Sequence, residues 1–407
     1  MKKTVYVEGI GCDRRLLEKS RIVRYLQAND FRFTNWPSRA DYILLFTCAF
    51  KRAEEDYSAA RLAVLQNYRG KLIVFGCLPD IAPHRIEESA NFHKLAPKDL
   101  PEIDNLFDAN RVRFADVETP VNFMGSHNET LYQSLRRNLR MHDFLLNRLL
   151  QIRGFFMKTQ DYFYLMVCRG CLGHCSYCAI PRAIGPIQSK PIANILNEFR
   201  RGLEGGHRDF VLLGDDLGSY GLDGQGSLPL LMDSLREELS AFGSSGNDFR
   251  ENQKPVRFHL KEVHPKNLLH YEESLHRIFE SSTVKSLLCP IQTGSPRILQ
   301  LMRREHTIDD IKRIIGKIRK INKGIEISTQ IIVGFPTETE QDFQSTLALV
   351  AELEFKWVVV FPFDPKNGSP AAEMEEKIPD LEIRGRTRKA LRYLRSHGIK
   401  GFTNCPW

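Results

Sequence analysis

The sequence VCRGCLGHCSYCAIPRA, residues 167–183, decides how the rest of the chain is interpreted. It places Cys171, Cys175 and Cys178 in one short loop, directly behind an apolar segment that is expected to be a strand. Three closely spaced thiolates can hold three irons of a [4Fe–4S] cluster and leave the fourth iron open. Zinc is the alternative, because zinc also binds paired cysteines. Cys168 is either a fourth ligand that closes the cluster, or a thiol at the strand end or near the substrate that binds no iron.

Strands and helices alternate after this loop. Strands are expected at residues 162–167, 210–213, 256–261, 284–291, 326–333 and 357–361, with helices at 192–203, 228–239, 308–320 and 340–353. Six strands joined by helical crossovers predict a parallel β/α barrel, complete or partial. Sites in such barrels gather in the loops that follow the strands, which is where the three cysteines fall. An open iron there can bind S-adenosylmethionine (SAM), whose sulfonium C–S bond an electron from the cluster can break.

The first third of the chain contains a second set of cysteines. Continuous apolar strands are expected at residues 4–10, 42–47 and 71–76, with helices at 13–29 and 53–68, which fits a parallel sheet covered on both faces. Cys12, Cys48 and Cys77 each come directly after one of these strands. The carboxyl ends of parallel strands lie along one edge, so the three thiols can converge there and hold a second [4Fe–4S] cluster. Three unrelated buried cysteines are the alternative.

The overall composition agrees with a soluble enzyme. No apolar run reaches the length of a membrane span, and the first residues lack a signal-peptide core, so we expect a cytoplasmic protein without a membrane partner. Nine cysteines in such a chain favour metal ligation or catalysis over disulfides. The net charge of +8 permits an anionic partner such as nucleic acid, but a solvated surface explains it equally well.

The predicted fold class is α/β, with two domains joined by a linker. We expect an N-terminal parallel sheet domain at residues 1–125, a basic helical linker at 126–157, a barrel domain at 158–395 and a C-terminal tail at 396–407. Residues 131–158 predict an amphipathic helix with five arginines. Such a helix can bind RNA or an acidic partner, or it can pack on its own protein, which we favour.

With these features in place, the chain resembles the radical-SAM methylthiotransferase family, whose members attach a methylthio group to unactivated carbon. The resemblance runs over nearly the whole chain. In the N-terminal domain it is carried by EGIGCDRRLLEKSRI, ADYILLFTCAF and LIVFGCLPD. In the barrel it is carried by CSYCAIPRAIG, PIQTGSPRILQLMRREHT, ISTQIIVGFPTETEQDF and FPFDPKNGSPAAEM.

The resemblance implies a role for each set of residues. The barrel-loop thiols would hold the cluster that cleaves SAM, with Tyr177 in the aromatic place before the last cysteine, and the N-terminal thiols an auxiliary cluster that carries or supplies sulfur. The residues implied to lie beside SAM are Gln292, Gly294, Ser295 and Gly334. A second SAM would supply the methyl group, and a reductase or flavodoxin-type donor the electron.

Two further segments of the barrel are less clearly assigned. His264 matches a family position of uncertain purpose. The segment GDDLGSYGLDG, residues 214–224, resembles the branch that modifies a protein aspartate. Its Asp215, Asp216 and Tyr220 could face the cofactor or substrate, or could belong to a polar loop at the barrel rim.

Some positions depart from the family pattern. Gln330 stands where an acidic residue is usual, and Thr337 where Gly is usual. The sequence ends at GFTNCPW, without the small β-barrel (TRAM domain) with which members dock RNA or a ribosomal protein. We therefore expect a methylthiotransferase acting on a peptide or small-molecule substrate, with tRNA disfavoured.

Two alternatives remain open. One is a tRNA methylthiotransferase lacking the TRAM domain. The other is a radical-SAM enzyme whose auxiliary cluster only transfers electrons or anchors substrate. The sequence assigns no role to Cys289 or Cys405.

Overall fold

The structure is a computed structural model that describes residues 2–86, 91–107, 111–118, 162–244, 255–280 and 283–403. The linker at 126–157, the basic helix expected at 131–158 and Cys405 lie outside the described residues.

The N-terminal part is a parallel sheet with strand order β2–β1–β3–β4–β5. The three expected strands are present as β1 (Thr4–Gly9), β3 (Tyr42–Thr47) and β4 (Lys71–Gly76), and the short β2 (Arg32–Phe33) and β5 (His93–Leu95) extend the edges. Every residue of β3 is buried, because helix α1 (Asp13–Ala28) covers one face of the sheet and α2 (Arg52–Leu65) covers the other. The continuous apolar run YILLFT is therefore explained by a strand with no solvent-facing side.

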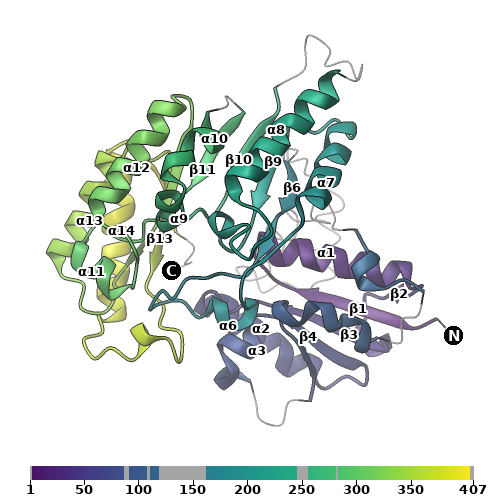
Figure 1. The fold of residues 1–407 in the computed structure, drawn as a ribbon. Coiled ribbons are helices and arrows are strands. Elements are labelled where there is room, and N and C mark those ends of the chain that lie inside the picture. The colour runs from purple at the N-terminus through teal and green to yellow at the C-terminus, as the bar shows by residue number, and fades with distance from the viewer. Residues whose placement is uncertain are drawn as a thin grey trace.

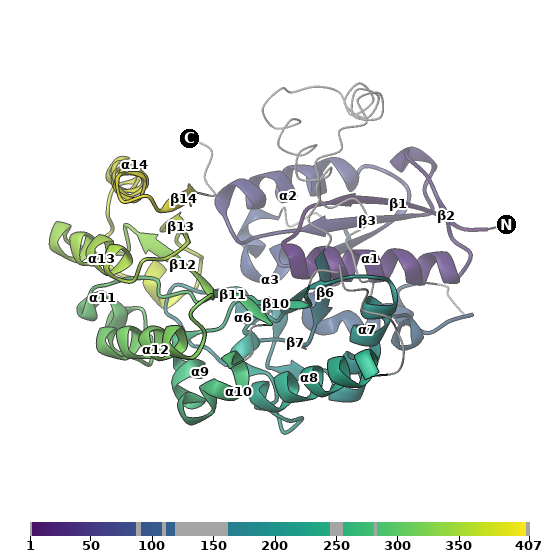
Figure 2. The same ribbon diagram turned by 90° about the horizontal axis from the view of Figure 1, so that it is seen from above.

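The second sheet is also parallel and has the order β14–β13–β12–β11–β10–β9–β6. Its strands are β6 (Tyr162–Met166), β9 (Asp209–Leu213), β10 (Arg257–Leu260), β11 (Val284–Leu288), β12 (Glu326–Val333), β13 (Trp357–Pro362) and β14 (Lys400–Thr403). In the described part of the chain the sheet is curved but open, with β6 and β14 at its edges (Figure 2). The fold is thus α/β, and the barrel is partial.

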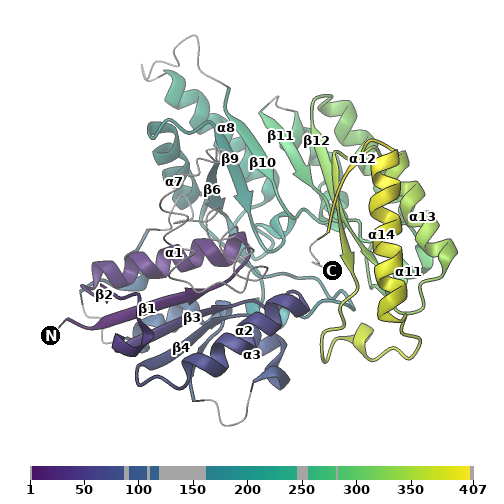
Figure 3. The same ribbon diagram turned by 180° about the vertical axis from the view of Figure 1, so that it is seen from behind.

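Helices cover the outer side of the curved sheet. They are α7 (Ile192–Glu204), α8 (Leu228–Ser244), α9 (Pro265–His270), α10 (Leu275–Phe279), α11 (Pro296–Leu301), α12 (Ile308–Ile321), α13 (Glu340–Glu352) and α14 (Asp380–Ser396). Figure 3 shows α14 lying beside β13 and β14 on the side far from the N-terminal sheet. The strand β14 falls within residues 396–407, which were expected to form a tail. It escaped prediction because KGFT is short and largely exposed, so it carries no apolar pattern.

The two sheets are packed together at the β6 edge of the partial barrel (Figure 1). Leu17 of α1 packs with Met166, Val211 and Leu213 of β6 and β9. Farther along, α3 (Leu78–Ile81) packs against α6 (Ile180–Ile184), the helix that follows the barrel cysteines. The loops after β1 and β4 therefore lie close to the loops after β6 and β9.

Candidate functional site

The barrel cysteines lie in a loop whose entry and exit are fixed by backbone contacts. Just before the loop, β7 (Cys168–Arg169) pairs with β8 (Gln188–Ser189), and α6 begins two residues after Cys178. Gly170 has φ +84°, and a Cβ atom there would lie 1.9 Å from the carbonyl oxygen of Pro186. Only glycine can occupy that position, and it lets the chain turn sharply into the loop. Within the loop, the backbone N–H of Gly173 donates to the Sγ of Cys171 at 3.2 Å.

The three barrel thiols influence one another electrostatically. Burial, followed by negative charge on Asp216 and on the other two cysteines, raises the pKa of Cys171 to about 12. Burial and then charge on Cys175 raise the pKa of Cys178 to about 12. Such thiols lose their protons readily only when a cation joins them, and thiolate is the form that binds iron. The donor set therefore fits the [4Fe–4S] cluster expected here.

Arg304 is a buried cation beside this loop that sequence reasoning did not single out. Its Nη1 lies 3.5 Å from the Sγ of Cys175 and 3.4 Å from the hydroxyl of Tyr177, while Nη2 donates to the carbonyl of Pro290 at 2.7 Å. The segment containing Arg304 was recognised, but nothing in RREH shows which of its two arginines turns inward. Because a hydrogen bond or positive charge at a thiolate favours the more negative state of a cluster, Arg304 is placed to tune the barrel site.

Asp216 and His264 lie against Cys171. One ligand atom from each of the three residues lies within 4.8 Å of the others. The carboxylate of Asp216 is fully buried and accepts hydrogen bonds from Asn267 at 2.8 Å and Ser219 at 2.7 Å. Burial lowers the pKa of His264 to about 4, so its imidazole is neutral at physiological pH.

The other two residues expected to face cofactor or substrate do not join Asp216. Tyr220 is fully buried and its hydroxyl donates to the carbonyl of Lys190 at 2.9 Å. Asp215 turns to the N-terminal domain, where it contacts Arg14 and Arg15. Of the three, only Asp216 places its side chain beside Cys171 among the described residues, whereas Asp215 contacts the start of the loop through a hydrogen bond from the backbone N–H of Gly170.

The N-terminal cysteines also come together, although they are far apart in the sequence. Cys12 and Cys77 occupy the N-cap positions of α1 and α3, and the backbone N–H of Cys48 donates to the hydroxyl of Ser58 at 3.1 Å. Burial and then charge on Cys12 raise the pKa of Cys48 to about 12. Burial raises the pKa of the Cys77 thiol well above its usual range. The positive charge of Arg15 lowers this pKa, whereas negative charge on Cys48 and Cys12 raises it. This donor set fits an iron–sulfur cluster for the same reason as the first.

Gly76 is what allows two of these strand ends to lie side by side. It has φ +125°, and a Cβ atom would lie 2.2 Å from the carbonyl oxygen of Thr47. The residues that follow, Cys48 after Thr47 and Cys77 after Gly76, are held next to each other by this close approach.

Cys168 is set apart from both groups. It is 2% exposed, and its Sγ lies 3.6 Å from the carbonyl oxygen of Asp216, behind the loop that follows β9. A Cβ atom on Gly214 would lie 2.5 Å from that sulfur, so the thiol fills a space that glycine leaves. Cys289, also buried, sits among the barrel core residues after β11.

The residues expected beside SAM lie at the carboxyl ends of β11 and β12, but most are engaged in packing. The hydroxyl of Ser295 caps α11 and donates to Asp342, and Gly294 packs against the backbone of α13. Gly334, with φ +79°, packs against Ile383 of α14. Gln292 differs from them. It is 7% exposed, and its Oε1 is buried without a hydrogen-bond partner among the described residues. A buried orphan acceptor of this kind fits a donor on a bound ligand.

The two departures from the family pattern have local explanations. Gln330 donates from Nε2 to the carboxylate of Glu262 at 3.1 Å, so a carboxylate is present beside position 330 but comes from the loop after β10. Burial raises the pKa of this carboxyl group. Thr337 adopts φ +67°, where glycine is easier, and Arg297 stabilises it with hydrogen bonds to its hydroxyl at 2.9 Å and its carbonyl at 2.7 Å.

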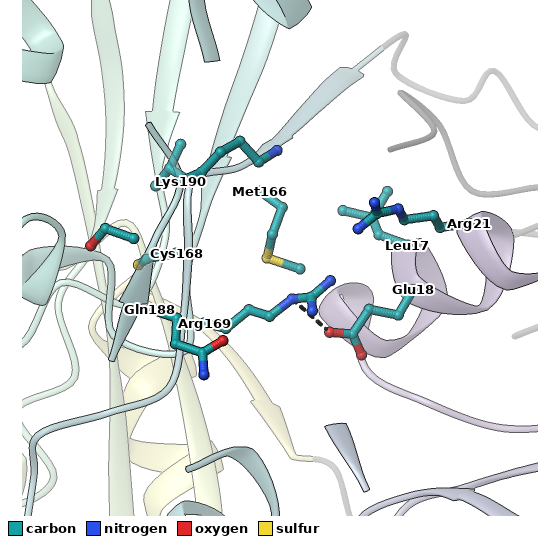
Figure 4. Close-up of a pocket in the computed structure, with 10 residues that line it drawn as sticks. Leu17, Glu18, Arg21, Met166, Cys168, Arg169, Gln188 and Lys190 are labelled. Atoms are coloured by element: carbon teal, nitrogen blue, oxygen red, sulfur yellow. Dashed lines mark ion pairs between the residues drawn. The ribbon is translucent and has the colours of Figure 1, made fainter. Parts of the chain in front are cut away.

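A cavity of about 190 Å³ lies between α1 and the ends of β6, β7 and β8 (Figure 4). Three of its side chains are cationic, from Arg21, Arg169 and Lys190, and Figure 4 shows Arg169 paired with Glu18 across it. Burial lowers the pKa of Arg21 to about 10. None of the six cysteines expected to bind iron lines this cavity, whose walls come from α1 of the N-terminal domain and from β6, β7 and β8 of the barrel domain.

Comparisons with known proteins define the class. The sequence pattern of the Radical SAM superfamily matches residues 165–350, which hold the barrel cysteines, and that of Uncharacterized protein family UPF0004 matches residues 4–96, which hold the N-terminal ones. The fold and the cysteine loop are those of a radical-SAM enzyme.

Relatives named as methylthiotransferases match nearly the whole chain. The probable threonylcarbamoyladenosine tRNA methylthiotransferase of Methanocaldococcus jannaschii is 27% identical over 97% of this chain and 83% of its own. The ribosomal protein uS12 methylthiotransferase of Alkaliphilus oremlandii is 29% identical over 94% of this chain and 80% of its own. The two matched patterns and these relatives fit the radical-SAM methylthiotransferase family, whose enzymes use SAM and two [4Fe–4S] clusters.

Solved structures agree on the fold. The radical SAM methyltransferase TsrM from Kitasatospora setae superposes with a TM-score of 0.58 over 91% of this chain and 77% of its own, at 12% identity. No helix among the described residues is both long and apolar enough to cross a membrane.

Proposed function

We propose that this protein is a tRNA methylthiotransferase, which converts a C–H group of a tRNA nucleoside to C–S–CH3. The expectation of a peptide or small-molecule substrate rested on the end of the sequence. The relatives support the alternative instead, because those from M. jannaschii and Aquifex aeolicus, each matching 97% of the chain, are named for tRNA. Domain 1–125 would hold the auxiliary cluster and domain 158–395 the SAM-cleaving cluster.

The observation that carries the choice of RNA is an exposed basic face on α14. Arg388, Arg392 and Arg395 are all exposed and follow one another at helical spacing, so they lie on one side of the helix. Among the described residues none of the three has an ion-pair partner. Unpaired arginines neutralise phosphates. The adjacent strand β14 carries Lys400 and Phe402, the latter 51% exposed, but on the sheet face away from α14, because Gly401 between them packs against Leu391 and Leu394.

The proposed chemistry assigns a task to each group of residues. The clusters and SAM supply one-electron cleavage, sulfur and the methyl group. Cys171, Cys175 and Cys178 are the proposed ligands of the first cluster, with Arg304 hydrogen-bonded to one of them. Cys12, Cys48 and Cys77 are the proposed ligands of the second.

Further residues of the barrel would hold SAM. Gln292 would offer its buried Oε1 to a donor on SAM, whereas Gly294, Ser295 and Gly334 are engaged in packing and, with Tyr177, would act by shaping the site. His264, neutral beside Cys171, adds no charge to the first site.

Binding and product assays test the substrate. Reconstituted protein with SAM and a reductant is incubated with unmodified tRNA, with prenylated or threonylcarbamoylated tRNA, and with uS12 protein, and the digests are analysed by mass spectrometry. We expect a methylthiolated nucleoside from one of the tRNAs and a steep fall in tRNA affinity with salt, about one power of ten per tenfold salt for each phosphate contacted. A methylthio group on uS12 and none on tRNA would contradict the proposal. The substrate would then be a protein, as the names of the uS12 relatives indicate for those enzymes.

A charge variant tests the surface. Arg388→Gln with Arg392→Gln and Arg395→Gln should weaken tRNA binding at least tenfold at low salt and flatten its salt dependence by about three units of slope. Arg313→Gln with Lys312→Gln and Lys317→Gln, three basic residues on α12 that pair with Glu272 or Glu352, is the matched control. Equal loss in both variants would show that only total charge matters.

A further inference from the structure

Asp215 is the point at which the two cysteine-bearing segments meet. Its Oδ1 lies 3.1 Å from the Nε of Arg14 and 3.3 Å from the Nη2 of Arg15. These arginines come two and three residues after Cys12. Its Oδ2 accepts a hydrogen bond from the backbone N–H of Gly170 at 3.0 Å, and Gly170 directly precedes Cys171. One carboxylate therefore contacts the start of both iron-binding segments, which belong to different domains.

The contact is extended on both sides by further charges. Arg14 also donates from Nη1 to the carbonyl of Gly214 at 3.3 Å. Arg15 pairs from Nη1 with Glu18 at 3.0 Å, and Glu18 pairs with Arg169 at 3.1 Å. Acidic and basic side chains therefore alternate from Asp215 of the barrel, through Arg15 and Glu18 of α1, to Arg169 of the barrel. Arg169 directly precedes Gly170.

These charges are removed from water. The side chains of Arg15, Glu18 and Asp215 are 3%, 2% and 5% exposed. Buried ion pairs add little net stability compared with apolar side chains of the same size, because desolvation offsets their attraction. What such pairs can provide is a unique register between the elements they join. In this molecule the elements joined are the two loops whose separation decides whether a carbon radical formed at one site can reach sulfur at the other.

We propose that Asp215 is a positioning residue that sets the distance between the two cluster sites. It does so by binding Arg14 and Arg15 behind Cys12 and the backbone of Gly170 in front of Cys171. The proposal rests on the two-cluster chemistry of the family and is independent of whether the substrate is tRNA.

Asp215→Asn keeps the shape and the hydrogen bond from Gly170 but removes the charge that holds both arginines. The matched control is Asp209→Asn, at the start of β9, the strand that precedes the Asp215 loop, where the carboxylate is held by Arg257 at 2.6 Å and His259 at 3.0 Å within the barrel. Arg14→Gln is the milder partner variant, because it leaves the contacts of Arg15 in place. It replaces Asp215→Asn if that protein does not fold.

Two readouts separate positioning from a merely structural role. The first is the magnetic interaction between the two reduced clusters, measured by spin relaxation in electron paramagnetic resonance, which needs no substrate. The second is the number of deoxyadenosine molecules formed per methylthio group transferred. In Asp215→Asn we expect full iron content, a weakened and broadened interaction, and a rise in the second ratio on the order of tenfold or more, because small misplacements of reacting groups are costly. Asp209→Asn should change neither readout.

The proposal would be overturned if Asp215→Asn kept its full iron content, an unchanged magnetic interaction between the clusters and an unchanged number of deoxyadenosine molecules per methylthio group. Loss of iron from either site in this variant would also count against it, since Asp215 would then be needed to build a site instead of spacing two. If tRNA proves not to be the substrate, the magnetic readout still decides, so failure of this proposal and failure of the proposed function are distinguishable.

Discussion

The two cysteine sites are built in opposite ways. Cys171, Cys175 and Cys178 lie in one loop of eight residues, so local sequence brings them together once the loop turns at Gly170. Cys12, Cys48 and Cys77 lie on three separate strand ends and meet only when β1, β3 and β4 pair in the correct register. A site of the first kind survives a local error elsewhere, whereas a site of the second kind depends on the whole sheet. The variants below exploit that difference.

The largest effects should come from removing one set of thiols. The unsubstituted protein, reconstituted without oxygen, should bind about eight irons, as two four-iron clusters require. Replacing Cys171, Cys175 and Cys178 by Ala should leave about four irons and abolish cleavage of SAM. Replacing Cys12, Cys48 and Cys77 by Ala should also leave about four, but SAM should still be cleaved to deoxyadenosine while no sulfur is transferred.

Iron analysis and chromatography of the nucleosides check this prediction. If either triple variant lost all of its iron, the two sites would not be independent and the comparison would fail.

A smaller change should separate the sites by their dependence on register. Gly76→Ala places a Cβ atom against the carbonyl of Thr47 in a backbone conformation that alanine avoids, and should destabilise the fold by more than about 1 kcal/mol. We expect iron to fall towards four per chain, with SAM cleavage retained, because only the N-terminal site is displaced. Gly316→Ala on α12 is the control. Nothing lies within 4 Å of its Cβ position, so it should be neutral or stabilise by up to about 1 kcal/mol. Thermal unfolding and iron content decide, and retention of both clusters in Gly76→Ala would show that the sheet register tolerates the change.

The next effect is electrostatic and confined to the loop site. Arg304→Gln removes a positive charge next to Cys175. The loss of this charge disfavours the reduced state of the cluster, because that state is the more negative one. The reduction potential of the SAM-cleaving cluster should fall by about 60 mV, a tenfold change for one electron, while that of the auxiliary cluster stays constant. Redox titration followed by electron paramagnetic resonance distinguishes the two. Equal shifts in both would mean that Arg304 acts on the fold as a whole.

The sequence predicts local elements of the fold better than it predicts contacts between distant elements. The bounds of β3, β4 and β12 were predicted to the residue. For β3 and β4 the reason is a continuous apolar run, such as YILLFT, which marks a strand buried on both faces. The short edge strands β2, β5 and β14 were missed, since two to four partly exposed residues carry no periodicity. Helix α14 was missed as well, although its basic face became central to the proposed function.

Contacts between the domains could not be predicted. Nothing in GDDLG indicates that Asp215 turns to Arg14 and Arg15 while its neighbour Asp216 turns to Cys171, because that choice depends on how the two sheets pack. The same holds for Glu262, whose carboxylate reaches Gln330 across the barrel mouth. Motifs identify what a loop can bind, but tertiary packing decides which neighbour a side chain meets.

The smallest expected effect concerns Cys168, which lies close to the loop site in sequence but outside it in space. It precedes Cys171 by three residues, and yet its sulfur is buried behind Gly214 and contacts the carbonyl of Asp216. Cys168→Ala should therefore leave the iron content, the SAM cleavage and both cluster potentials unchanged. It should lower the free energy of unfolding by about 1 kcal/mol, because a buried side chain is shortened without complete collapse of the space. Iron analysis beside a denaturant titration measures both quantities. A loss of about four irons would mean that Cys168 is a ligand of the cluster. The loop site would then include a cysteine that is near in sequence although its sulfur lies apart in the structure.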